Sequence, residues 1–255
     1  MVIFGNEMEY VFIMKILIPI LITSIAGLST LLGNILLFVD SKYKDRLISF
    51  CMGLSFIVMF LISVLELIPE GIGLVKDRFL LYELFLYSLL LLVVGYIFVV
   101  FVDNRIDSDS KLYKIGILST VSLLIHNIPE GIICTISSLN DIEFGLKMSF
   151  MIMMHNIPEG IVISLPIYYA TKSRWRALLY TVISSLGEVF GAIITMLFLY
   201  KFINDFIMYV VFIVTAGIMI TLSAGKILKE GISYRMFKWL ILGILFGLGI
   251  IVVTM

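Results

Sequence analysis

The sequence has few charged residues for its length. Only 14% of its 255 residues are Asp, Glu, Lys or Arg, whereas 61% are hydrophobic. A water-soluble domain of this length would carry about a quarter charged residues, so the composition indicates a membrane protein instead. The formal net charge is zero, and nothing in the charge balance therefore predicts a nucleic acid or another highly charged partner.

Cysteine and histidine are scarce as well. The two cysteines, Cys51 and Cys134, fall in different apolar segments, which excludes a disulfide framework and a CxxC metal site. The two histidines, His126 and His155, each begin the same six-residue stretch, HNIPEG, at 126–131 and again at 155–160. All the imidazole in the chain therefore lies inside two neighbouring apolar segments.

Long apolar runs fill much of the remaining sequence. The stretches 16–39 and 84–102 contain no Asp, Glu, Lys, Arg or His, and a bilayer core needs about 20 residues of helix. Lipid offers no partner to backbone polar groups and strand-type alternation is absent, so these runs are predicted to be helices. We predict one all-α polytopic membrane domain over 1–255, with transmembrane helices near 13–39, 47–70, 80–102, 113–139, 147–170, 177–200, 206–225 and 237–254.

Basic residues indicate how the helices are oriented. Thirteen of the eighteen Lys and Arg residues fall in the odd-numbered connections, which are therefore expected on the cytoplasmic side. Both termini should then lie outside, in agreement with eight helices. The first helix is too long for a signal peptide and lacks a basic leader, so we expect a multi-pass protein of the cell (inner) membrane.

A few polar residues are predicted inside the membrane, where each ionisable group costs at least ~2.5 kcal/mol. Within each HNIPEG copy, His and Glu are four residues apart and share one helix face. Consecutive helices run antiparallel, so His126, Glu130, His155 and Glu159 can meet near the middle of the bilayer. Imidazole and carboxylate together suit Zn²⁺, Fe²⁺, Mn²⁺ or Co²⁺, whereas Ca²⁺ and Mg²⁺ need no imidazole and Cu(I) prefers sulfur.

Other polar residues accompany this group. Pro129 and Pro158 each remove a backbone donor inside a predicted helix and free a carbonyl near the histidines. A fainter copy of the motif, ELIPEGI at 66–72, places Glu66 and Glu70 near the outer end of the second helix, on the expected path of an ion. For Glu70 a solvated helix end is the favoured interpretation, whereas Glu66 fits either role.

Each of three further polar residues could have either of two roles. Glu188, in GEVFG at 187–191, can either reach a shared metal site or form a structural hydrogen bond. The amides Asn127 and Asn156 can either coordinate a metal or orient its ligands.

The two HNIPEG copies on consecutive helices, followed by SLGE at 185–188, resemble the ZIP family of divalent-metal transporters, and most closely its bacterial zinc-uptake branch. The resemblance covers essentially the whole chain and implies an eight-helix bundle with a binuclear-type site. It implies a primary site of His126, Glu130, His155 and Glu159, beside a second site of Asn127, Asn156 and Glu188. It also implies elevator motion of helices 1, 4, 5 and 6 against helices 2, 3, 7 and 8.

The chain departs from the family pattern at two residues. Asn156 stands where family members often have an acid, which implies a weaker or absent second metal. Lys226, in SAGKILKEG at 223–231, stands where many relatives carry an acidic residue. The connection before the fourth helix is short and contains no histidine, so the histidine-rich cytoplasmic segment of some members is missing.

We therefore expect an importer that carries a divalent metal into the cytoplasm and has no resident cofactor. Zn²⁺ is the first candidate, and Fe²⁺, Mn²⁺, Co²⁺ and Cd²⁺ remain open. The alternative is an intramembrane zinc-dependent hydrolase, which the lack of an HExxH motif and of a separate nucleophile disfavours. A homodimer in the lipid bilayer is also open, because Gly243 and Gly247 can support helix pairing inside or between subunits.

Overall fold

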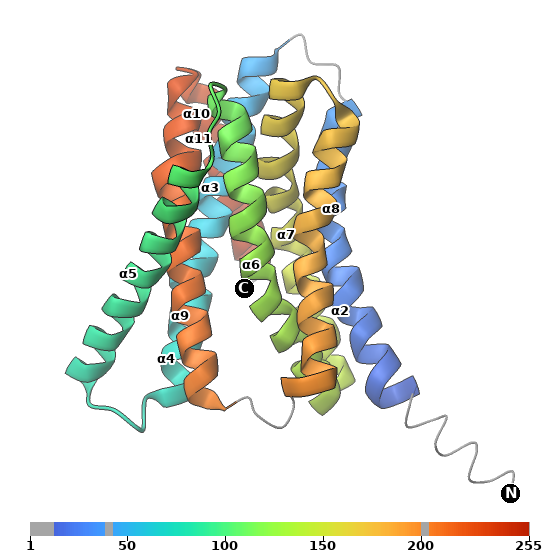
Figure 1. Cartoon of the computed structure of the whole chain (residues 1–255), viewed down its shortest axis with the longest axis vertical. Helices are drawn as coiled ribbons and strands as arrows, with labels where there is room; N and C mark the ends of the chain where they lie inside the picture. Colours follow the sequence, from blue (N-terminus) through green and yellow to red (C-terminus); the bar gives the residue numbers. More distant parts are fainter. Residues whose placement is uncertain (1–12, 39–42, 200–203, 255) are drawn as a thin grey trace, which may run out of the picture.

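The computed structural model describes residues 13–38, 43–199 and 204–254, and within these ranges the chain is a bundle of long helices (Figure 1). Both chain termini, and the predicted helix ends at 39 and 200, lie outside the described residues. In chain order the helical segments are η1–α2–η2 (Ile13–Leu17, Ile18–Leu28, Ser29–Phe38), α3–η3–α4 (Lys44–Ile62, Ser63–Leu67, Ile68–Val75), α5 (Leu81–Arg105), α6 (Lys111–Asn140), α7 (Ile142–Thr171), α8–η4 (Arg174–Ile194, Thr195–Leu199), α9–η5–α10 (Asp205–Leu222, Ser223–Ile227, Leu228–Ser233) and α11 (Phe237–Thr254).

The predicted all-α membrane bundle is confirmed. In the described part of the chain, seven helices are long and apolar enough to cross a bilayer, and α11 supplies a shorter apolar helix. The second and seventh segments run further than predicted, to Val75 and Ser233 instead of 70 and 225. The prediction ended these segments close to Glu70 and Lys226, yet each segment stays helical beyond its charged side chain. Glu70 is therefore not at the end of its helix, although its side chain is exposed.

The connections between helices lie at two opposite ends of the bundle. The connections 106–110, 172–173 and 234–236, which contain or adjoin basic residues such as Arg105, Lys172 and Arg235, lie at the upper end in Figure 1, whereas the connections 76–80 and 141 lie at the lower end. Under the positive-inside prediction the upper end is cytoplasmic. α5 leans away from the other helices at its lower end (Figure 1).

Close contacts at glycine divide the bundle into two units. The first, which we call the site unit, contains α2, η2, α6, α7 and α8, and the second, the frame unit, contains α3, η3, α4, α5, α9, η5, α10 and α11. In the site unit Gly33 lies against the backbone of Gly160, and in the frame unit Gly243 lies against the backbone of α3. For every described glycine with close neighbours, the atoms nearest to its Cβ position belong to its own unit. Glycine allows such close backbone approach, so each unit is tightly joined internally.

The boundary between the two units is mostly aliphatic. Ile161 and Leu165 of α7 belong to the same buried cluster as Val58 and Ile62 of α3. One hydrogen bond within this region joins the units, from the Ser55 hydroxyl to the Pro158 carbonyl at 2.9 Å. Such a boundary has few directional contacts to break if one unit moves along the other.

Candidate functional site

A one-residue connection between α6 and α7 sets the position of the two HNIPEG copies. Asp141 ends α6 and caps α7, where its carboxylate accepts hydrogen bonds from the backbone N–H groups of Glu143 and Phe144 at 2.8 and 3.3 Å. The two helices therefore run antiparallel in a fixed register. Both continue without interruption through Pro129 and Pro158.

The four residues of the predicted primary site meet between these helices. Glu130 Oε1 lies 3.0 Å from Nε2 of His126 and 3.0 Å from Nε2 of His155. Glu159 Oε1 lies 3.5 Å from Nε2 of His126. All four side chains are buried, and those of His126 and Glu159 have no exposed surface. The predicted convergence of these residues is observed, while their role as metal ligands stays a prediction.

The predicted second group lies beside the first and extends to α8. The amide nitrogen of Asn156 donates hydrogen bonds to Glu188 Oε1 at 2.6 Å and to the Ala26 carbonyl at 2.9 Å. The amide nitrogen of Asn127 donates to the Ser184 carbonyl at 3.3 Å. Both amides thus use their nitrogens for contacts within the protein, and their oxygens remain as acceptors.

Several buried polar atoms of the described residues in this region form no well-aligned hydrogen bond, although some of them lie close to an oppositely charged group. They are Oε2 of Glu130, Oε2 of Glu188, both carboxylate oxygens of Glu159, Oδ1 of Asn127 and Asn156, and both ring nitrogens of His126. Buried polar atoms are usually paired because an unpaired one is costly in a low-dielectric interior. In the described part of the chain, no three His, Cys, Asp or Glu side chains are already spread around a common metal position. The groups instead contact one another directly.

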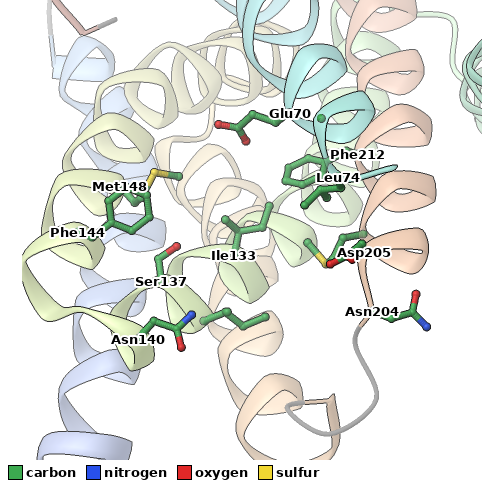
Figure 2. Close-up of a pocket in the computed structure, with 13 residues that line it drawn as sticks. Glu70, Leu74, Ile133, Ser137, Asn140, Phe144, Met148, Asn204, Asp205 and Phe212 are labelled. Carbon is green, nitrogen blue, oxygen red and sulfur yellow. The ribbon is translucent and has the colours of Figure 1, made fainter. Parts of the chain in front are cut away.

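A cavity of about 710 Å³ opens toward the lower end of the bundle, between α4, α6, α7 and α9. We call it the vestibule. Figure 2 shows Glu70 at its inner end, and Asn140 and Asn204 at the opposite end. Most of its wall is apolar, with Phe144 and Phe212 among the lining side chains.

A narrow pocket of about 30 Å³ lies between the vestibule and the primary site. Glu70 and Met148 line both cavities, and the narrow pocket also reaches Glu66, Glu130 and His155. The predicted path residues Glu66 and Glu70 therefore lie between the vestibule and the histidines. Sequence reasoning did not assign Met148 or Phe212 to this path, since an apolar side chain that lines a cavity looks like any other core residue.

Comparison with known proteins identifies the family of this chain. Residues 104–255 match the family model described as ZIP Zinc transporter, and the match includes both HNIPEG copies. The chain belongs to the ZIP family. Its resemblance to that family, first inferred from the motifs, is therefore confirmed, and the chain is a multi-pass membrane transporter and not an enzyme.

Bacterial members of the ZIP family align with nearly the whole chain. The zinc transporter ZupT of Oceanobacillus iheyensis is 31% identical over 266 residues, which span 94% of this chain and 98% of that protein. The proteins of the same name from Streptococcus mutans and Campylobacter jejuni are 31% and 30% identical, over 92% and 94% of this chain and 95% and 96% of their own. The bacterial branch suggested by the motifs is thus confirmed.

Proposed function

We propose that this ZIP-family protein imports a divalent metal, with zinc as its main substrate, through the site between α6 and α7. The observation that carries the proposal is the buried group of His126, Glu130, His155 and Glu159, which a narrow pocket separates from a vestibule at one end of the bundle. Two carboxylates balance the charge of one divalent ion in a medium where an unpaired charge is costly.

The distances between these side chains suit zinc. Ligand atoms about 2.0–2.2 Å from a tetrahedral Zn²⁺ lie roughly 3.3–3.5 Å from one another. The observed separations of 3.0 Å and 3.5 Å between imidazole nitrogens and carboxylate oxygens differ from this by a few tenths of an ångström. A zinc ion could therefore replace the direct contacts after small side-chain shifts. Fe²⁺, Mn²⁺, Co²⁺ and Cd²⁺ are chemically similar competitors for such a site.

The vestibule supports uptake from the outer side. It opens at the lower end of the bundle, which the positive-inside pattern assigns to the outside. An ion would meet Glu70 and then Glu66 before it reaches the histidines. Toward the upper end, Leu118 and Leu123 of α6 are buried in one apolar cluster with Met219 and Leu222 of α9, which closes that side.

The division into two units supports elevator transport. All residues of both metal sites stand on α6, α7 and α8, and α2 contacts them through the Ala26 carbonyl. The site unit could therefore carry the ion past the frame unit without rearranging its ligands. The frame unit supplies Glu66 and Glu70, which would stay at the outer side during this movement.

The second group favours a single transported ion. Asn156 is neutral where an acid would add charge, and its amide donates to the Glu188 carboxylate, which holds Glu188 without a metal. We therefore propose that the primary site binds the ion and that Asn127, Asn156 and Glu188 provide a weaker neighbouring site.

Zinc accumulation by bacterial cells that lack their own zinc uptake systems tests the proposal. Cells that produce the natural chain should accumulate more zinc than cells without it, and His155→Ala should abolish the gain. Lys147→Ala changes an exposed lysine paired with Glu143 on its own helix, so it should keep the gain. Unchanged zinc in cells whose membranes contain the natural chain would overturn the importer proposal.

A further inference from the structure

Asp103, near the end of α5, is held by lysines from two different helices. Lys226 of η5 donates a hydrogen bond from Nζ to Asp103 Oδ2 at 2.6 Å. Lys114 of α6 places Nζ 3.4 Å from Asp103 Oδ1. α5 and η5 are parts of the frame unit, whereas α6 is part of the site unit. The Lys114 contact therefore crosses the boundary between the units, and the Lys226 contact does not.

This cluster lies at the end of the bundle opposite the vestibule. Asp103 and Lys114 flank the connection 106–110, at the upper end in Figure 1. The Asp103 side chain is 17% exposed and the two lysine side chains are about one-third exposed, so water screens the charges only in part. At the same end Lys44 of the frame unit lies 4.8 Å from the ring centre of Tyr169 in the site unit.

We propose that Asp103 docks Lys114 and thereby holds the site unit in the position in which the metal site faces the vestibule. The proposal rests on the two-unit transport described above and names residues that control it. Lys114 is then a positioning residue for transport, because it acts on the metal site only through the position of α6.

The sequence of α6 makes this docking specific to one position. If the site unit moved toward the upper end, the next turn of α6 would come level with Asp103. Residues three and four positions after Lys114 share its helix face, and they are Ile117 and Leu118. Neither offers a positive charge, so the moving unit would give Asp103 no replacement partner.

Lys226 has a different part in this cluster. It belongs to the same unit as Asp103, so this pair persists when Lys114 leaves. A carboxylate that loses its only partner in a partly buried place is destabilised. Lys226 therefore lowers the free energy needed to separate Lys114 from Asp103. This explains a role for a lysine at a position where many family members carry an acidic residue.

The labelling rate of a cysteine in the vestibule tests the proposal. Ser137 lines the vestibule on α6, and Ser137→Cys in a chain carrying Cys51→Ala and Cys134→Ala offers one thiol to a membrane-impermeant maleimide. Lys114→Ala should slow labelling by about two- to five-fold, the range expected for a partly exposed ion pair. Lys226→Ala should not slow it.

A matched control removes a different positive charge from the same unit and the same end. Arg176 on α8 is exposed and forms no ion pair with the frame unit in the described part of the chain, so Arg176→Ala should leave the rate unchanged. Asp103→Asn combined with Lys114→Ala should slow labelling no more than Lys114→Ala alone. The two changes remove the same contact between Asp103 and Lys114, so their effects should not add.

Equal rates for Lys114→Ala and Arg176→Ala would overturn the docking proposal, as would additive effects of Lys114→Ala and Asp103→Asn. The labelling reports the position of the site unit and needs no zinc transport. Failure of docking is therefore distinct from failure of the importer proposal, which the zinc accumulation experiment detects separately.

Discussion

Oε1 of Glu130 lies 3.0 Å from Nε2 of His155, although the two residues stand on different helices and 25 positions apart in the chain. The one-residue connection at Asp141 brings them together, because it leaves α6 and α7 no freedom to shift their register. This cross-helix contact makes Glu130 the central carboxylate of the site, since it also contacts His126 on its own helix.

Glu130→Gln should therefore weaken zinc binding most severely among the carboxylate variants. The change removes the negative charge that faces both imidazoles and leaves the size of the side chain nearly unchanged. Loss of an outer-shell partner already costs about 10–100-fold in metal affinity, so a direct ligand should cost at least 100-fold. Calorimetric titration of the purified protein with zinc checks this, with the exposed Glu143→Gln as a control. Equal affinities for the two variants would contradict the assignment.

Asn156→Asp should strengthen the second metal site. The new carboxylate adds a hard, charged ligand next to Glu188, and it removes the hydrogen bond that now holds Glu188. Without metal the two carboxylates repel each other, so the metal-free protein should become less stable while its zinc stoichiometry rises from one to two. Equilibrium dialysis measures the stoichiometry. One zinc per chain in both proteins would argue against a latent second site.

Gly160→Ala should destabilise the site unit. A methyl group at this position would collide with the Thr30 carbonyl, and backbone cannot move away as a flexible side chain could. Overpacking of this kind costs about 1–3 kcal/mol. The matched control is Gly73→Ala, where no atom lies within 4 Å of the added methyl group. Thermal unfolding in detergent should show a lower midpoint for Gly160→Ala alone, and equal midpoints would show that the close contact does not matter.

Glu66→Gln should raise the zinc concentration needed for half-maximal uptake and leave the maximal rate nearly unchanged. Glu66 lines the narrow pocket beside His155 from the frame unit, so it attracts the ion before it binds but does not travel with it. The concentration dependence of uptake into cells separates the two effects. A fall in the maximal rate with unchanged half-saturation would place Glu66 in the moving site instead.

The helices and the meeting of the two motifs could be predicted because both depend on local patterns. Apolar runs long enough for a bilayer define the spans, and the spacing of His126 and Glu130 on one helix face follows from helical periodicity. The antiparallel order of neighbouring spans then places the second motif opposite the first. None of these inferences requires knowledge of how distant helices pack.

The features that the sequence did not reveal depend on contacts between distant segments. The extension of α4 beyond Glu70 was missed because a carboxylate ends an apolar run in the sequence, while the structure places that carboxylate in a cavity lined by four helices. Similarly, Lys226 was noted only as a departure from the family pattern. Its partner Asp103 lies 123 positions away, and no local pattern connects the two.

Uptake of radioactive zinc into proteoliposomes that contain only the purified protein tests the central claim most directly. The account predicts saturable uptake by the natural chain, its loss in both His126→Ala and His155→Ala, and its retention in Arg176→Ala. Uptake that persists in both histidine variants would contradict transport through the site between α6 and α7.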